Sequence, residues 1–172
     1  MYRKIQSNIP LIAFNKGAAT YTFLETGDIY EFCNGYQMVN QYQGNLSDGA
    51  ISNIYLRVYE NGKPELFPLR GKASQAVLTK NEEKLCCTSW VKDILCKVEF
   101  VPCSENLWFW NVTLEGNGAE CDLVYVQDTG VGDKGAILNN LLYVSQYVDH
   151  KIMDSEYGVV FLNERTNSET KM

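Results

Sequence analysis

The chain has 172 residues, of which 45% are hydrophobic, 12% aromatic and 21% charged, and its formal net charge is −6. This composition is typical of a folded globular domain and excludes a disordered chain, and the length suits one domain. Apart from Arg3-Lys4, the 15 Lys and Arg residues are scattered singly, which excludes the clustered positive charge that nucleic acids and anionic membrane surfaces require.

The first residues carry no secretory or membrane signal. Two positive charges, Arg3 and Lys4, precede an apolar run over Ile9–Phe14 that is too short for a signal peptide and contains Pro10. No stretch approaches the roughly 20 apolar residues of a membrane helix. We therefore expect a cytoplasmic protein with no membrane partner, in which residues 1–15 lead into the first strands.

Apolar residues alternate with polar ones along much of the chain, which is typical of strands with one buried face. In chain order, the segments expected as strands are Tyr21–Leu24, Ile29–Phe32, Ile54–Tyr59, Ile94–Val101, Trp108–Leu114, Asp122–Gln127 and Val159–Leu162. Turn residues separate them, and Asn61-Gly62 is the dipeptide that a type I′ hairpin prefers. Strands spaced about 10 residues apart with such turns indicate a sandwich or barrel.

Helical signal is weak. Ala136–Leu141 is compatible with one helical turn, whereas Tyr143–Val148 has the pattern of a strand. The tail over 164–172 is polar, and we expect it to be frayed. The sequence therefore predicts an all-β antiparallel sandwich with little or no helix, forming one domain over residues 1–172.

The six cysteines show no metal-binding pattern. They include no CxxC pair, and the single histidine, His150, has no cysteine near it in the sequence. A zinc site needs about four ligands with short paired spacings. We therefore expect reduced, buried cysteines, no metal and no cofactor. Asp149 and His150 are adjacent on an expected strand, where they face opposite ways, which favours a structural role for the histidine over a catalytic base.

Polar side chains concentrate between Tyr125 and His150. Carboxylates and amides bind sugar hydroxyls, and aromatic rings cover the apolar sugar face, so the mixture is typical of a neutral carbohydrate site. The alternative is that Asp128 and Asn140 serve turns and strand ends. The candidate contact residues, for carbohydrate or for another domain, are Gln127, Asp128, Asp133, Asn140, Tyr143, Gln146, Tyr147 and His150.

Gly130–Gly135 superficially suggests a phosphate-binding loop. A dinucleotide fingerprint requires a surrounding βαβ unit, and this chain offers strands instead. A tight turn with close backbone approach is the better interpretation, and the sequence identifies no catalytic residue.

Eight short motifs occur in one order, over Gly27–Glu31, Met38–Gln41, Asp48-Gly49, Asn53–Arg57, Trp108–Trp110, Leu114–Gly118, Gln127–Gly135 and Tyr143–His150. Together they resemble the N-terminal region of glycoside hydrolase family 94 enzymes. The resemblance is strongest to 1,2-β-oligoglucan phosphorylases and the phosphorylase portion of cyclic β-1,2-glucan synthases, and weaker to cellobiose phosphorylases. It covers roughly residues 20 to 165.

The resemblance implies a galactose-mutarotase-like sandwich that a helical linker joins to a catalytic (α/α)6 barrel. The barrel binds glucan and inorganic phosphate, the latter as a substrate, and the family needs no metal or organic cofactor. We expect the barrel to be absent from this chain and to be its partner in cis or in trans. Asp128 and Asp133 match sandwich positions of the family and not its catalytic acid.

The sequence thus favours a non-catalytic domain of a β-glucan phosphorylase, which is structural and contacts carbohydrate or the barrel through residues such as Gln146 and His150. A free-standing module that binds β-glucan oligosaccharides is the alternative. A mutarotase-type enzyme is a third, but it needs more than one histidine. An apolar face left uncovered by a missing barrel would also favour a homodimer.

Overall fold

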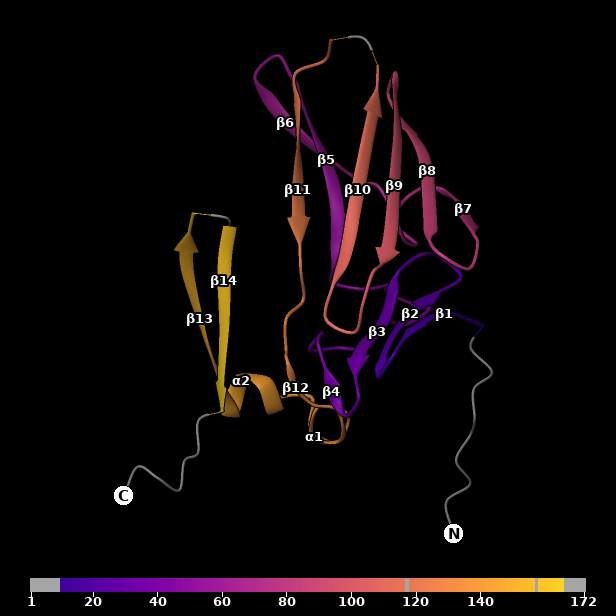
Figure 1. Ribbon diagram of the computed structural model, residues 1–172. Helices are drawn as coiled ribbons and strands as arrows, with labels where there is room; N and C mark the ends of the chain where they lie inside the picture. Colours follow the sequence, from indigo (N-terminus) through magenta and orange to yellow (C-terminus); the bar gives the residue numbers. More distant parts are fainter. Residues whose placement is uncertain (1–9, 117, 157, 166–172) are drawn as a thin grey trace.

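Figure 1 shows a computed structural model of the chain, which describes residues 10–116, 118–156 and 158–165. Its strands are β1 (Leu11–Lys16), β2 (Ala19–Leu24), β3 (Ile29–Asn34), β4 (Gln37–Met38), β5 (Asn53–Glu60), β6 (Lys63–Pro68), β7 (Val77–Lys80), β8 (Leu85–Val91), β9 (Ile94–Pro102), β10 (Trp108–Glu115), β11 (Cys121–Val126), β12 (Gly132–Asp133), β13 (Val148–Ser155) and β14 (Gly158–Arg165). Two short helices, α1 (Lys134–Asn139) and α2 (Tyr143–Tyr147), lie between β12 and β13. Every pair of strands in the described ranges is antiparallel, which confirms the expected all-β class.

One central sheet, in the order β10-β9-β8-β7, packs against two others (Figure 1). These are a five-stranded sheet in the order β1-β2-β3-β4-β12 and a three-stranded sheet in the order β11-β5-β6. The long strands β8, β9 and β10 of the central sheet contribute side chains to the clusters against both, so the sandwich has one layer of one sheet and a second layer made of two sheets.

Two hydrophobic clusters fill the space between the layers. In the first, Phe100 of β9 packs with Phe23 and Phe32 of the five-stranded sheet, with ring centroids 4.9 Å and 5.2 Å away. In the second, Val98 of the same strand belongs to a cluster with Leu56 of β5. Because β9 contributes to both clusters, burial of one strand holds the two halves of the second layer together.

The predicted alternation is confirmed in the central strands. In β9 the residues from Ile94 to Pro102 alternate between buried and half-buried positions without a break. The hairpin at Asn61-Gly62 is also confirmed, since these residues have φ values of 52° and 75° and join β5 to β6.

A fully buried arginine lies where the sheets meet. The Arg70 guanidinium donates to the carbonyl oxygens of Ser52 at 2.6 Å and Gly27 at 3.2 Å. It also lies over the ring of Trp110 at 4.7 Å. Burial lowers its pKa, and the two carbonyls with the ring face replace part of its lost hydration. Arg70 therefore fastens the loop before β5 to the turn before β3.

The helices correct one prediction. The expected turn over Ala136–Leu141 is found as α1, but Tyr143–Val148, expected as a strand, contains α2. The Asn140 side chain accepts the N–H of Leu142, and its carbonyl accepts the N–H of Tyr143 at 2.8 Å, which turns the chain into a helix. Only Val144 of α2 is buried, in a cluster with Ile137, because one face of this short helix caps the end of the sandwich.

The last two strands form a separate two-stranded sheet beside the sandwich (Figure 1). The expected strand over 159–162 lies within β14, which continues through Glu164 and Arg165 into the segment predicted as tail. Residues 166–172 of that tail lie outside the described part of the chain, as do residues 1–9 of the expected lead-in. The rest of the lead-in is already structured, because β1 begins at Leu11.

Candidate functional site

The end of the molecule with the two helices also carries a long irregular connection, residues 39–52, between β4 and β5. Connections of this length without regular structure are uncommon and are often functional. Several polar side chains hold this loop in place, and two of them belong to the segment from which the sequence predicts a site. These contacts decide which side chains are available to a ligand.

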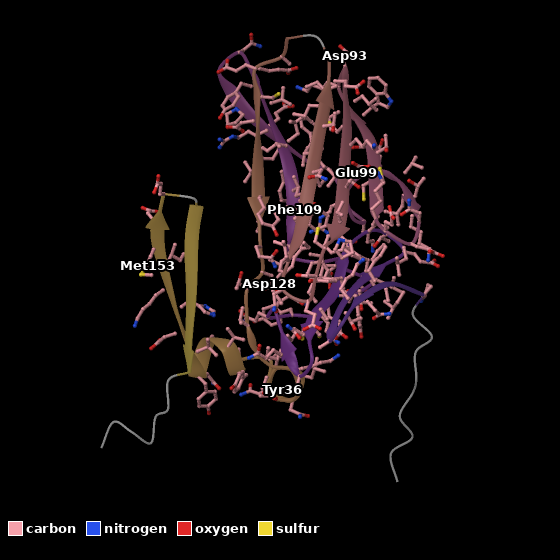
Figure 2. The ribbon with its side chains drawn as sticks, in the orientation of Figure 1. Tyr36, Asp93, Glu99, Phe109, Asp128 and Met153 are labelled. Atoms are coloured by element: carbon pink, nitrogen blue, oxygen red, sulfur yellow. The ribbon has the colours of Figure 1, made fainter. Side chains whose placement is uncertain are left out.

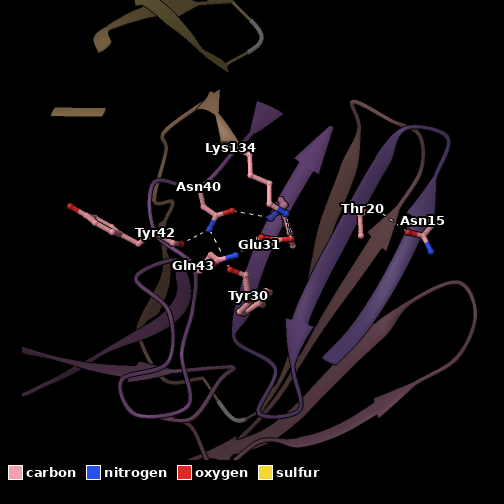
Figure 3. Close-up of polar contacts among 9 residues, drawn as sticks. Asn15, Thr20, Tyr30, Glu31, Asn40, Tyr42, Gln43 and Lys134 are labelled. Carbon is pink, nitrogen blue, oxygen red and sulfur yellow. Dashed lines mark hydrogen bonds and ion pairs between the residues drawn. The ribbon is translucent and has the colours of Figure 1, made fainter. Parts of the chain in front are cut away.

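Asn40 anchors the start of the loop, as Figure 3 shows. Its Oδ1 accepts the backbone N–H of Phe32 at 2.9 Å, and its Nδ2 donates to the carbonyl oxygen of Tyr42. The side chain is 2% exposed. Asn40 thus replaces the strand partner that β3 lacks at this point and satisfies buried backbone groups.

Asp128, a predicted contact residue, anchors the same loop from the other side. Its Oδ2 accepts the backbone N–H of Tyr42 at 2.9 Å, and its own N–H donates to the Ser52 hydroxyl at 2.8 Å. Burial raises the pKa of its carboxyl group, although hydrogen bonds from the backbone of Tyr42 and Gln41 oppose the shift. In the structure Asp128 therefore stabilises a loop, which agrees with the alternative role that the sequence offered for it.

Asp28 also holds the loop in place, although the sequence shows it only as part of a turn. Its carboxylate accepts hydrogen bonds from the Thr26 hydroxyl and the Lys72 backbone N–H, both at 2.7 Å, and from the Ala50 N–H at 3.2 Å. The side chain is 2% exposed. Three donors around one carboxylate stabilise the turn before β3 and the far end of the loop together.

Glu31, Gln43 and Lys134 form a half-buried polar triad beside the loop (Figure 3). Lys134 Nζ lies 2.6 Å from Glu31 Oε1, and Gln43 Nε2 donates to Glu31 Oε2 at 2.5 Å. Burial lowers the pKa of the Lys134 ammonium, but the hydrogen bond and the charge of Glu31 outweigh it, so the pKa is raised. The triad fixes the first residue of α1 against β3 and holds the Gln43 side chain in one position.

Asp133 and Asn140, also predicted contact residues, hold α1 at its two ends. Asp133 Oδ1 accepts the N–H of Ala136 at 2.8 Å as the N-cap, and the Asn140 N–H donates to the carbonyl of Ala136 at 3.0 Å. The Asn140 amide also donates to Gln146 Oε1 at 3.2 Å. These are the ordinary roles of Asp and Asn at helix ends.

The turn after Asp128 approaches the backbone of the loop closely, as predicted. The N–H groups of Gly130 and Val131 both donate to the carbonyl of Val39, at 2.7 Å and 3.0 Å. A Cβ on Gly130 would lie 2.9 Å from the Cα of Gln41. Glycine is therefore required here by packing against the loop.

Gln127 and His150, two further predicted residues, each contact a neighbouring segment. Gln127 lies beside Tyr125, accepts its hydroxyl hydrogen and donates to the Asp128 carbonyl at 2.8 Å. His150 Nε2 lies 3.4 Å from the carbonyl oxygen of Gly130. Neither contact belongs to an acid–base pair.

Tyr143 and Tyr147 are one helical turn apart on α2, and their ring centroids are 5.6 Å apart at an angle of 38°. Tyr143 also borders a hollow of about 270 Å³, whose lining is Tyr36, Gln37, Val131, Gly132, Asp133, Tyr143 and Val148. Tyr36 is 76% exposed, and Figure 2 shows it at the tip of this end of the molecule. We call this hollow the Tyr36 hollow. It brings the predicted residues Asp133 and Tyr143 together, whereas Gln127 and Asp128 do not line it.

The described residues contain no group of three or more His, Cys, Asp or Glu side chains that could hold a metal ion. Within the same ranges, no helix has the length and apolar character needed to cross a membrane. Another hollow, of about 550 Å³, lies between β1 and the turn before β8, where Asn15, Asn81, Lys80 and Glu82 line it. Its one aromatic residue, Phe14, is buried in the core, so this hollow has no exposed ring comparable to Tyr36.

Comparison with known proteins gives two matches. A family model described as the SOGP N-terminal domain matches residues 22–171. A 1,2-β-oligoglucan phosphorylase from Listeria innocua serovar 6a is 29% identical over 121 residues, which are 70% of this chain and 11% of that protein. The chain therefore corresponds to a small part of this relative's length.

Proposed function

The chain belongs to the SOGP N-terminal domain family, and from this premise we propose that it is a non-catalytic domain of a β-glucan phosphorylase. In this proposal it supports a catalytic domain of the same enzyme, supplied in cis or in trans, and contacts the glucan through the Tyr36 hollow. Inorganic phosphate is then a substrate of the catalytic domain and not a ligand of this chain.

The use of the carboxylates is the observation that carries the non-catalytic role. Glycoside cleavage by acid–base chemistry needs a carboxyl group that faces the substrate. Asp28, Asp128 and Asp133 instead accept hydrogen bonds from backbone N–H groups of neighbouring turns, loops or helices. These three acidic residues of the motifs that resemble the phosphorylase family therefore build the fold.

The Tyr36 hollow supports the carbohydrate contact. Tyr36 is exposed and Tyr143 half-buried, and both line the hollow beside the amide of Gln37 and the carboxylate of Asp133. Aromatic rings with amide and carboxylate groups match the two kinds of surface that a glucose unit offers, its C–H face and its hydroxyl edge.

Two measurements on this chain test the proposal. Incubation with β-1,2-linked glucooligosaccharides and phosphate should release no glucose 1-phosphate above the blank. Calorimetric titration with the same oligosaccharides should show weak binding that Tyr143→Ala reduces, while Tyr59→Ala, on the distant strand β5, leaves it unchanged. Product formation would contradict the non-catalytic role, and unaltered binding in the Tyr143 variant would remove the Tyr36 hollow as the contact.

Binding strength separates this role from that of a free-standing carbohydrate-binding module. A module that acts alone must bind its glucan tightly by itself, whereas a domain that shares the glucan with a catalytic partner needs only a few contacts. The mutarotase alternative stays a sequence-based hypothesis, and the one histidine of the chain, His150, argues against it.

A further inference from the structure

We propose that the loop over residues 39–52 is a second carbohydrate-binding site, built around Tyr42 and suited to a neutral oligosaccharide of at least two sugar units. This site is separate from the Tyr36 hollow and shares no residue with it. The proposal goes beyond the phosphorylase role and does not depend on it, because it rests on the geometry of the loop alone.

Two hollows meet at this loop. One has a volume of about 430 Å³ and the other of about 320 Å³, and both are lined by Tyr42, Gln43 and Asn45. The first continues over Asp48 and Ile51, and the second over Tyr30 and Gln41 towards the apolar side chains of α1. Two adjoining hollows on either side of one aromatic residue fit consecutive sugar units better than a single compact ligand.

The loop is rigid at the points that matter for binding. Asn40 and Asp128 hold the backbone of Tyr42 through its carbonyl and its N–H. Further along, Lys72 Nζ donates to the carbonyls of Leu46 at 2.8 Å and Ser47 at 2.7 Å. A surface that is already ordered loses less conformational entropy when a ligand binds, so these contacts serve binding as well as stability.

The ring of Tyr42 is free to act as a platform. Only its backbone groups contact Asn40 and Asp128, and Figure 3 shows its ring pointing away from β3. Tyr30 is half-exposed at the neighbouring hollow. Aromatic rings at two hollows can each cover the apolar face of one sugar unit.

The polar groups select a neutral ligand. Gln41, Gln43 and Asn45 supply amides, while Asp48 and the nearby Glu31 supply negative charge. The neighbouring cations, Lys72 and Lys134, already contact loop carbonyls and Glu31. Since the whole chain also has a net charge of −6, phosphate esters and uronic acids are disfavoured relative to neutral sugars.

The experiment is an NMR titration of the full chain with a β-1,2-linked glucotriose, followed at backbone amide signals. We expect shifts at residues 41–51, and we expect Tyr42→Ala to weaken binding about tenfold, a typical effect of one aromatic contact. Tyr42→Phe should keep most of the affinity, and Asp48→Ala, at the exposed rim, should weaken it about threefold.

Tyr36→Ala is the matched control, because it removes a ring from the other hollow. Shifts at residues 41–51 that persist in this variant, and disappear in Tyr42→Ala with an unchanged melting temperature, support the proposal. Loss of these shifts in Tyr36→Ala, equal affinity of Tyr42→Ala and the native chain, or tighter binding of an oligoglucuronate would each overturn it. The glucose 1-phosphate assay is independent of every one of these outcomes, so failure here is distinguishable from failure of the phosphorylase role.

Discussion

The carboxylate of Asp128 accepts the backbone N–H of Tyr42 at 2.9 Å, and this bond joins the segment in which the sequence predicts a site to the loop that carries the hollows. Both residues lie in irregular segments far apart in the sequence. Their contact explains how one polar residue in a motif can shape hollows that it does not line.

Replacement of Asp128 by alanine should destabilise the chain and loosen the loop. The change leaves the half-buried N–H of Tyr42 without its acceptor, which costs about 1 kcal/mol. Asp128→Asn retains an oxygen acceptor and should lose much less. Urea unfolding measures the stability of both variants, and equal loss of stability in both would contradict the role of the acceptor.

The native chain and Asp128→Asn should differ in how their stability depends on pH. Burial raises the pKa of Asp128 above its ordinary value of 3.8, so the native state holds a proton that the unfolded state releases. Its contribution to stability is therefore fully present below 3.8 and is lost as the pH rises through the folded pKa. Relative to Asp128→Asn, the native chain should lose stability over this range, and parallel pH profiles of the two proteins would refute the assignment.

Arg70→Met should be among the most destabilising single changes in the chain. It leaves the carbonyls of Ser52 and Gly27 without their donor and removes the group that lies over Trp110. We expect a loss of about 3 kcal/mol, measured by urea unfolding. Arg57→Met is the control, because Arg57 pairs with Asp122 at the surface. A loss no larger than that of the control would show that Arg70 does not connect the sheets.

Gly44→Ala should disrupt the loop from within. An added Cβ would overlap the carbonyl oxygen of Ile29, and Gly44 also donates its N–H to Tyr30 at 2.9 Å. The loop must then move away from β3, so the melting temperature should fall and binding at Tyr42 should weaken. In the control Gly135→Ala, the added Cβ would meet only Asp133 Oδ1 within 4 Å, at 3.2 Å. Calorimetry measures the melting temperatures of Gly44→Ala and Gly135→Ala, and equal melting temperatures would refute close packing of the loop.

The strands could be predicted because their burial follows a simple period. In β9, Ile94, Cys96, Val98 and Phe100 are buried and the residues between them are half-buried, which is what alternation predicts. The helix α2 could not be predicted in this way. It is too short for a helical period, and its position depends on the Asn140 side chain and on Val144 packing with Ile137.

The candidate site was less predictable, because its geometry depends on contacts between distant segments. Sequence alone places Asp128 among polar residues, but its partner Tyr42 lies 86 positions earlier and outside the eight motifs. Asp28 and Asn40 also lie in motifs that the resemblance covers, yet nothing in a turn pattern shows that their side chains are buried. The available signal was the presence of an Asp or Asn in the three motifs that contain Asp28, Asn40 and Asp128, because such side chains often bond to the backbone.

The cysteines should divide sharply by reactivity. Cys103 is exposed and Cys121 half-buried, which corrects the expectation that all six are buried, whereas Cys33, Cys86, Cys87 and Cys96 are buried. Burial raises the pKa of Cys87 to about 12, against the opposing charge of Arg70, and that of Cys33 to about 11. Because the thiolate is the reactive form, iodoacetamide at pH about 8 should label Cys103 first and the buried four only after unfolding. Peptide mass mapping measures this, and equal labelling of Cys87 and Cys103 in the native chain would contradict it.

The raised pKa of Cys87 also predicts how stability changes in alkaline solution. The ordinary value is 9.0 and the folded value is about 12, so between them the native state keeps a proton that the unfolded state releases. The contribution of this thiol is fully present below 9.0 and is lost as the pH rises towards about 12. Cys87→Ala, which also removes a buried side chain, should be less stable at neutral pH but should show a shallower decline. Urea unfolding between these pH values tests it, and an equally steep decline in the variant would show that another group causes the alkaline loss.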